Sequence, residues 1–185
     1  MKSTWLALSV GALIVSLMTT VRIAIAQDTT DASSSDRKFI HQALQGGNAE
    51  VKFGQLAAQK GNSEDVKQFG QKIVDDHTRL GGQIKLIAQQ ESIEIPDGIA
   101  GKDKALEEKL SGLSGDEFDR AFIQAMVRDH RKDLFEFQKE ADSGNDTSVR
   151  HAASQGAQVI GEHLQIAEQM AQLHGVQTSK TSNND

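Results

Sequence analysis

The chain has 185 residues, with 20 basic and 26 acidic side chains, and it contains neither cysteine nor tyrosine. Because its formal net charge is −6, it is a poor candidate for binding nucleic acid or an anionic membrane surface, and we expect neither partner. The missing side chains exclude disulfides, thiolate chemistry and any mechanism that needs a phenol or a tyrosyl radical.

Residues 1–26 predict a secretory signal peptide. Lys2 precedes an apolar run of 14 residues from Trp5 to Met18, and a small-x-small motif follows at Ala24-Ile25-Ala26. These are the features of a cleavable signal, so we expect a cut after Ala26 and a periplasmic or secreted protein without a membrane span. A spanning helix needs roughly 18 or more apolar residues, so a signal retained as an anchor is the second alternative.

The segments on either side of the expected domain are polar. Residues 27–35 (QDTTDASSS) and 175–185 carry little that could be buried, and they predict a disordered linker and a disordered tail. Residues 36–174 hold four long amphipathic segments, which predict one all-α domain, a four-helix bundle.

The first two helices are expected over 36–60 and 63–90, and the short turn between them requires antiparallel neighbours. Gly47 and Gly54 lie seven residues apart in the first helix. Since glycine within a helix costs about 1 kcal/mol relative to alanine, they indicate close approach by a neighbouring helix. The apolar seam of the second helix alternates steps of four and three residues, which is typical of packed helices. Its positions are Val66, Gly70, Ile73, His77, Leu80, Ile84 and Ile87.

The stretch 91–113 contains Pro96, the only proline, and a short amphipathic segment at about 102–110. A helix of about 26 residues is roughly 39 Å long, and a connection of this length can return along the whole bundle. We therefore expect two antiparallel hairpins joined by a long crossover that carries a short helix, which is the ferritin-like arrangement.

The third helix is expected over 114–141, opened by a capping box at Ser114 and Glu117, and the fourth from a cap at Asp146 to about Leu173. The inward positions of the third helix are Phe118, Phe122, Met126, Leu134 and Phe137. The seam of the fourth helix is Val149, Ala152, Gly156, Val159, His163, Ile166, Met170 and Leu173.

One polar residue interrupts the inner side of each long helix near its midpoint: Glu50, His77, His130 and His163. Midpoints meet at one level in a bundle whether neighbouring helices run parallel or antiparallel, so we expect these side chains to form one central layer. Three imidazoles and a carboxylate suit a single transition metal such as Zn, Cu or Fe.

An acid precedes each of the three histidines: Asp76, Asp129 and Glu162. A residue one position earlier is turned by about 100° around the helix, so each acid can accept a hydrogen bond from a histidine ring on a neighbouring helix. The alternative interpretation of the layer is structural, because buried His and Glu side chains can hydrogen-bond one another and fix the helix register.

Several motifs occur in the same order in a known family. They are Phe39 through Gly47-x-x-Glu50-Val51-x-x-Gly54-x-Leu56-Ala57, Val74-x-Asp76-His77, Phe118-Asp119 through Asp129-His130, and His163-Leu164. Over these segments the chain resembles the bacterial domain of unknown function family 4142. The resemblance implies an exported, ferritin-like helical protein, and no established activity comes with it. Ferritin-like di-iron proteins carry Glu-x-x-His, but Val74 and Ile160 stand three residues before the histidines here, which argues against a di-iron oxidase.

We therefore interpret the chain as an exported ferritin-like bundle, a periplasmic metal-binding or envelope stress-related protein. The alternative is a non-enzymatic structural or interaction module whose polar layer only fixes helix register. A haem protein with two axial histidines is a third interpretation, although covalent haem attachment needs cysteine. No serine lies in a nucleophile elbow, so we expect a non-enzyme rather than a hydrolase. The sequence does not specify the metal, the protein partner, or whether the chain forms a homo-oligomer.

Overall fold

Five helices make up the part of the chain that the structure, a computed structural model, describes, residues 32–178. They are α1 (Ser34–Lys60), α2 (Glu64–Gln90), α3 (Gly101–Gly112), α4 (Gly115–Ser143) and α5 (Thr147–Leu173). Strands are absent from this range, which confirms the all-α prediction. The predicted signal peptide, 1–26, lies outside the described residues, and within them no helix is both long and apolar enough to cross a membrane.

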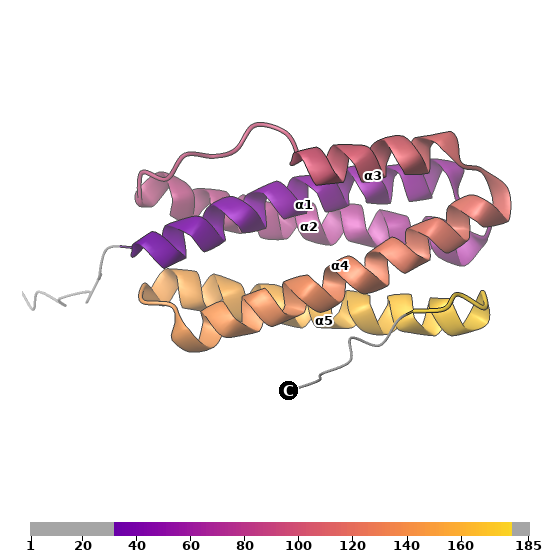
Figure 1. Ribbon diagram of the computed structural model, residues 1–185. Helices are drawn as coiled ribbons and strands as arrows, with labels where there is room; N and C mark the ends of the chain where they lie inside the picture. The colour runs from indigo at the N-terminus through magenta and orange to yellow at the C-terminus, as the bar shows by residue number, and fades with distance from the viewer. Residues whose placement is uncertain (1–31, 179–185) are drawn as a thin grey trace, which may run out of the picture.

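The helices form two hairpins, α1–α2 and α4–α5 (Figure 1). After α2 the chain runs back along the bundle through residues 91–100 and α3, so α4 starts at the end of the bundle opposite to the one where α2 stops. This path is the long crossover with a short helix that the sequence predicts.

The start of α1 corrects the predicted boundary of the linker. The Ser33 hydroxyl accepts a hydrogen bond from the Asp36 amide at 3.2 Å, and the Asp36 carboxylate accepts one from the Ser33 amide at 2.8 Å. This capping box provides acceptors for backbone amides that the first turn of a helix leaves free. The helix therefore starts at Ser34, two residues earlier than predicted and inside the predicted linker 27–35.

Two other predictions at helix ends are also wrong. Ser114 is the N-cap of α4, but its side chain makes no capping hydrogen bond, so the capping box predicted there does not form. At the C-terminus, the amide of Val176 donates to the carbonyl of Ala171 at 2.8 Å, and Val176 packs against the core. The predicted disordered tail 175–185 therefore begins with residues that are fixed to the bundle.

Asp36 links the two hairpins. Its fully buried carboxylate accepts hydrogen bonds from the amides of Asn145 and Asp146, in the turn between α4 and α5, at 3.0 and 3.2 Å. Asp36 also shares a hydrogen bond with the Glu140 side chain. Burial and this acidic partner raise the pKa of Glu140 to about 7, so the Glu140 carboxyl is close to half protonated at neutral pH.

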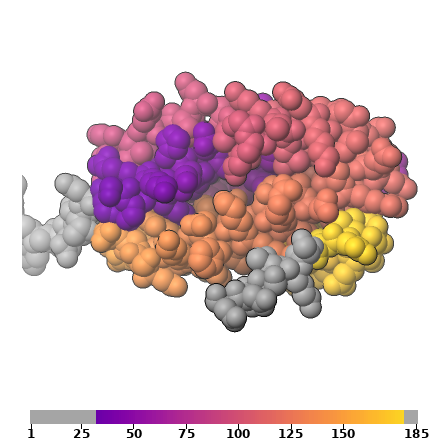
Figure 2. All heavy atoms as spheres, viewed as in Figure 1, coloured from indigo at the N-terminus to yellow at the C-terminus, as the bar shows by residue number. Residues whose placement is uncertain are grey.

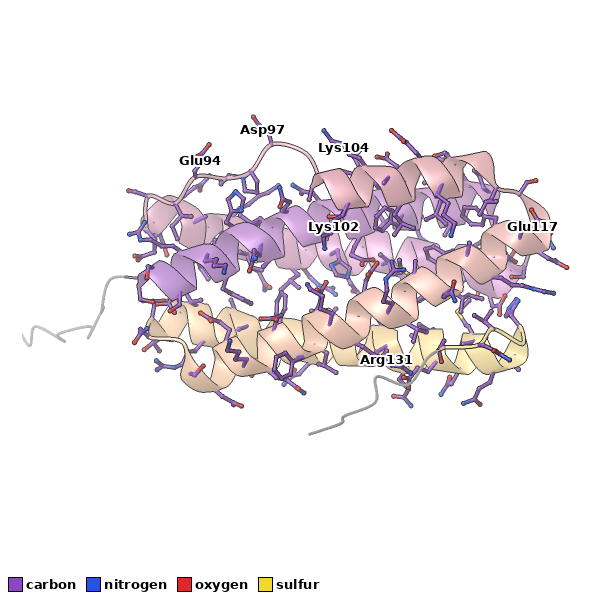
Figure 3. The ribbon with its side chains drawn as sticks, viewed as in Figure 1. Glu94, Asp97, Lys102, Lys104, Glu117 and Arg131 are labelled. Carbon is purple, nitrogen blue, oxygen red and sulfur yellow. The ribbon has the colours of Figure 1, made fainter. Side chains whose placement is uncertain are left out.

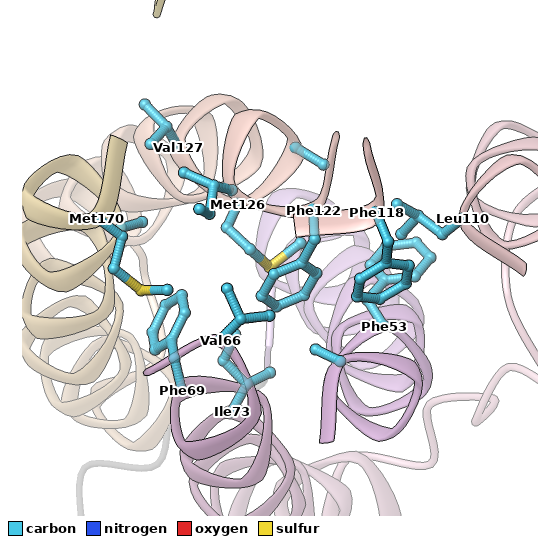
Figure 4. Packing of buried hydrophobic residues seen from close by; sticks show 14 of the residues in the cluster. Phe53, Val66, Phe69, Ile73, Leu110, Phe118, Phe122, Met126, Val127 and Met170 are labelled. Carbon is cyan, nitrogen blue, oxygen red and sulfur yellow. The ribbon is translucent and has the colours of Figure 1, made fainter. Parts of the chain in front are cut away.

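The apolar interior consists of two clusters, one on each side of the central layer. The first is shown in Figure 4 and includes Phe53, Phe69, Phe118, Phe122, Met126 and Met170. The second includes Phe39, Leu44, Leu80, Ile84, Phe137 and Ile160. Aromatic edges hold the second cluster together, since the rings of Phe39 and Phe137 meet edge to face at 4.9 Å between centroids.

Close approach of α1 to α2 explains the glycine at position 54, as the sequence predicts. A Cβ atom built on Gly54 would lie 2.6 Å from the carbonyl oxygen of Gly70, which is too short for any real contact. Gly47 is different, because a Cβ there would lie 4.0 Å from His77 Nδ1, an ordinary contact.

The buried face of α5 departs from the predicted seam toward its C-terminus. Val159 and Ile166 are only half-buried, and Leu173 is 80% exposed. The buried positions there are Ile160, His163, Ala167, Met170 and Ala171. The heptad positions Val149, Gly156, His163 and Met170 stay buried along the whole helix, and only the second row of the seam lies one residue later, at Ile160 and Ala167 instead of Val159 and Ile166.

The crossover helix α3 lies along α1 (Figure 1), and polar contacts at the surface join the two helices. Lys52 Nζ is 3.1 Å from Glu107 Oε1, and Lys60 Nζ donates to the carbonyl of Ser111. Leu110 is the one residue of α3 that is buried. Besides Leu110, the half-buried Leu106 is the one residue of α3 that packs against the core, so the apolar attachment of this helix is small.

Candidate metal centre

Three histidines meet in the centre of the bundle, one each from α2, α4 and α5. His77, His130 and His163 are 6%, 1% and 0% exposed, and one ring nitrogen of each lies within 4.8 Å of the others. Their ring centroids are 5.3 to 5.7 Å apart. Each ring lies on the side of its helix that packs into the core. The three helices therefore place three imidazoles at the same level of the bundle.

Hydrogen bonds outside the cluster fix the proton positions of two rings. Nδ1 of His130 must donate to the carbonyl oxygen of Met126, 3.0 Å away, because a carbonyl can only accept. Nε2 of His163 donates to Asp76 Oδ2 at 2.9 Å. A neutral imidazole carries a single N–H, so Nε2 of His130 and Nδ1 of His163 direct lone pairs toward the centre.

Burial keeps these rings neutral. It lowers the pKa of His130 well below 6.5, and the neighbouring His77 and His163 add to the effect. Burial likewise lowers the pKa of His163, although the hydrogen bond to Asp76 opposes the change. At pH 7 neither ring therefore carries a second proton that could lie between the two facing nitrogens.

The two facing nitrogens, His130 Nε2 and His163 Nδ1, are 3.3 Å apart. With no proton between them, this contact sets two lone pairs against each other in a buried site, which is unfavourable. Two ligands of a tetrahedral ion with Zn–N distances of 2.0–2.1 Å are themselves about 3.3 Å apart. A cation between the rings would therefore replace a repulsive contact by two coordinate bonds.

His77 supplies the third nitrogen. Its Nε2 atom is buried and has no hydrogen-bond partner among residues 32–178, while its Nδ1 atom faces Gly47 on α1. Burial, followed by the effect of His163, lowers the pKa of His77 to about 3. A neutral, unpartnered ring nitrogen in a buried polar layer is suited to act as a metal ligand.

Asp76 orients the His163 ring from outside the cluster, in the way that the sequence predicts. Lys72 Nζ donates to its carboxylate at 2.8 Å, and Arg79 donates to the other oxygen. Although burial alone would raise the pKa of Asp76, the hydrogen bonds from Lys72 and His163 lower it below 3.8. The carboxylate is therefore ionised and can accept the ring N–H of His163.

Sequence reasoning missed Lys72 and Arg79. They stand four residues before and three residues after Asp76, at the spacings that make helix side chains neighbours, so the pattern was present in the sequence. The acceptor for His130 is a backbone carbonyl, that of Met126 four residues earlier. Backbone acceptors leave no mark in the residue types, so only the helix geometry could have indicated it.

Glu50, on α1, is outside the group of three. It is 3% exposed, and its Oε2 atom has no hydrogen-bond partner in the described part of the chain. Burial, followed by the carboxylates of Asp129 and Asp133, raises its pKa well above 4.5. Burial thus favours the neutral form of this carboxyl, which lies one helical turn from Gly47, the glycine that faces His77.

The other two acids next to histidines lie elsewhere. Asp129 accepts hydrogen bonds from both Nε and a terminal nitrogen of Arg128 at 3.0 Å. The Glu162 side chain is mostly exposed and lies 3.9 Å from Lys72 Nζ. Within residues 32–178, neither carboxylate hydrogen-bonds to a histidine ring.

Solved structures share this arrangement of helices. A DUF305 fragment from Deinococcus radiodurans has a TM-score of 0.66 at 15% identity, covering 79% of this chain and 99% of its own. A DUF305 protein from Streptomyces coelicolor that is described as secreted has a TM-score of 0.66 at 11% identity, covering 78% and 97%. At such low identity the likeness shows a common fold.

A comparison with curated proteins gave no match. The sequence does match the family described as "Domain of unknown function (DUF4142)", over residues 23–170. This range includes both hairpins, the crossover and the three histidines, and it confirms the resemblance seen in the motifs. The chain therefore belongs to the DUF4142 family.

Proposed function

We propose that this protein is an exported metal-binding bundle that holds one transition ion, Zn, Cu or Fe, on His77, His130 and His163. The observation that carries the proposal is the pair of neutral ring nitrogens that face each other at 3.3 Å. Their N–H groups point outward to Met126 and Asp76, so the inner lone pairs are available. Imidazole nitrogens at this spacing match the ligand preference of these ions.

Glu50 is the proposed fourth ligand. Its Oε2 atom is buried without a hydrogen-bond partner among residues 32–178, three residues after Gly47, which faces His77. We expect a rotation of the side chain to bring a carboxylate to the ion from α1. Three neutral imidazoles leave the charge of a divalent ion uncompensated, so loss of the Glu50 proton on binding supplies a negative charge. This arrangement also uses a buried carboxyl oxygen, Glu50 Oε2, that has no hydrogen-bond partner among residues 32–178.

Export is proposed on two observations. The first is the basic start, short apolar run and small-x-small motif of residues 1–26. The second is a structural neighbour described as secreted. A metal-binding bundle outside the cytoplasm fits a role in metal handling or in envelope stress.

The test is elemental analysis of untagged protein made from the full-length sequence. We expect about one equivalent of Zn, Cu or Fe in the wild type and a loss of that ion in His77→Ala and His130→Ala. His151→Ala is the matched control, because His151 is exposed on α5 and its removal should leave the metal content unchanged. The mass of the purified chain reports at the same time whether residues 1–26 are removed.

Equal metal content in the wild type, the two variants and the control would contradict the proposal. A wild type without metal that gains none from added Zn, Cu or Fe would also contradict it. Either result would favour the structural alternative, in which the histidine layer only fixes helix register.

A further inference from the structure

The two sides of the histidine cluster differ in whether their buried carboxyl oxygens have partners. On the side of α2 and α5, both oxygens of Asp76 already accept hydrogen bonds, from His163, Lys72 and Arg79. The three rings are almost completely buried, so an ion that reaches them needs another side, on which a buried carboxyl oxygen without a partner can receive it.

Glu50 lies on that other side. Two glycines one turn before it place α1 against both α2 and α4: a Cβ on Gly47 would lie 4.0 Å from His77 Nδ1 on α2, and one on Gly46 would lie 3.9 Å from Asp133 Oδ2 on α4. Glu50 stands four residues after Gly46 and three residues after Gly47. Residues at these spacings are neighbours on a helix surface, so Glu50 lies next to both contacts. Its buried, unpartnered Oε2 atom stands between the ring of His77 and the carboxylates beyond.

Three aspartates continue from Glu50 toward solvent. The carboxylates that act on Glu50 are those of Asp129 and Asp133 on α4 and Asp103 on α3. Their side chains are 25%, 31% and 14% exposed, against 3% for the whole Glu50 residue. The three aspartates are thus partly exposed to solvent, whereas Glu50 is buried.

Each aspartate is paired with the basic residue that precedes it in the sequence. The pairs are Lys102 with Asp103 at 3.7 Å, Arg128 with Asp129 at 3.0 Å, and Lys132 with Asp133 at 3.1 Å. The basic side chains are 61% to 73% exposed, so each can move into solvent without disturbing the bundle. An arriving cation can therefore replace them one at a time.

The position of these residues fits an approach from solvent. Lys102 marks the start of α3, about midway along the length of the bundle (Figure 3). In the space-filling view the surface is recessed between α1, the start of α3 and α4 (Figure 2). Arg131, by contrast, pairs with Glu168 of α5 on the other side of α4.

We propose that Asp103, Asp129, Asp133 and Glu50 form an uptake route along which a divalent cation passes from solvent to the three histidines. The inference rests on the proposed metal centre. Carboxylate oxygens bind divalent cations more weakly than a set of imidazoles binds a transition ion, so the ion moves inward to the histidines. A row of carboxylates also focuses cations and speeds their arrival.

The test measures the rate at which metal-free protein takes up Co²⁺, followed by the visible absorption of the ion in a stopped-flow instrument at 0.1 M salt. The test variant is Asp103→Asn with Asp133→Asn. The matched control is Glu108→Gln with Glu136→Gln, which removes two exposed acids from the same two helices. We expect loading about tenfold slower in the test variant, within twofold of the wild type in the control, and one Co²⁺ per chain at the end in all three.

Equal rates in the wild type and both variants would overturn the route. Equally slow loading in test and control variants would also overturn it, because the cause would then be overall charge. A test variant that no longer reaches one Co²⁺ per chain while remaining helical by circular dichroism would make the aspartates ligands instead. If the wild type takes up no Co²⁺, Zn²⁺ or Cu²⁺, the metal centre itself fails, and the route fails with it.

Discussion

At the scale of single residues, the carboxylate of Asp76 has the largest expected influence on the centre without touching the ion. It accepts from His163 Nε2, Lys72 and Arg79, and so it sets which nitrogen of His163 faces inward. Asp76→Asn keeps one oxygen acceptor but loses the charge. We expect metal affinity to fall by about 10- to 100-fold, as for other residues that orient a ligand, when measured by competition with a chelator. Asp75→Asn, the exposed neighbour, is the control and should bind as the wild type does.

Because the pKa of Glu140 is shifted, we expect the free energy of unfolding to depend on pH through a group other than the histidines. Its pKa is about 7 in the folded protein, against an ordinary value of 4.5. Because the folded state holds this proton more tightly, its contribution to stability is complete below pH 4.5 and is lost as the pH rises through about 7. Glu140→Gln keeps a donor for Asp36 and does not titrate, so the free energy of unfolding should fall less between pH 5 and pH 8 than in the wild type.

Urea unfolding at several pH values measures this difference. Glu136→Gln, an exposed acid one turn earlier on α4, should retain the wild-type pH dependence. A profile for Glu140→Gln that is parallel to the wild type over this range would show that the pair with Asp36 does not shift the titration of Glu140.

At the scale of helices, glycine has opposite roles at different points of the same hairpin. Nothing lies within 4 Å of a Cβ built on Gly81 or Gly82 in α2, so Gly81→Ala and Gly82→Ala should each stabilise the protein by about 0.5–1 kcal/mol through backbone entropy. Gly54→Ala should destabilise it, because the new Cβ would lie 2.6 Å from the carbonyl oxygen of Gly70. Urea unfolding of the three variants tests both signs, and a loss of stability in the α2 variants would contradict the entropy argument.

The positions of the helices could be predicted from the sequence, but the buried face of one helix could not be predicted in full. Apolar spacing and turn residues locate all five helices, because burial of one face dictates that spacing. The method misplaces the C-terminal half of α5, where the seam moves from Val159 and Ile166 to Ile160 and Ala167. Val159 and Ile160 are both apolar, so residue types alone do not decide which of the two faces the core.

Glu50 illustrates the same limit for the site. Depth along a helix can be counted from sequence, and it brings His77, His130 and His163 together. Direction around a helix depends on its rotation in the bundle. Glu50 is three residues after Gly47, a turn of about 300°, so it points to one side of the contact with His77. The depth of the carboxylate was therefore predictable, but its distance from the rings was not.

At the scale of the whole molecule, the proposed ion would join the two hairpins. His77 belongs to α2, whereas His130 and His163 belong to α4 and α5, so one ion would bridge the halves of the bundle at its centre. Free Zn²⁺ at 100 times its dissociation constant should add about 2.7 kcal/mol to the free energy of unfolding. For a domain of this size that is a rise in melting temperature of about 5–10 °C.

Thermal unfolding with added Zn²⁺ and with a chelator measures this effect. His77→Ala should lose the rise, whereas His151→Ala should show it in full. A melting temperature of the wild type that is the same with Zn²⁺ and with chelator would mean that no ion bridges the hairpins.

The weak attachment of α3 has a consequence for hydrogen exchange. With one buried side chain, and with Lys52–Glu107 and Lys60–Ser111 contacts at the surface, this helix opens at a lower free energy than the bundle unfolds. Its amides should therefore exchange with solvent deuterium well before those of α1 or α2. Each opening carries Asp103 away from α4 and uncovers the region around Glu50 while both hairpins stay folded. The lifetime of the closed state of α3 then limits how often solvent reaches the histidine cluster of a folded molecule.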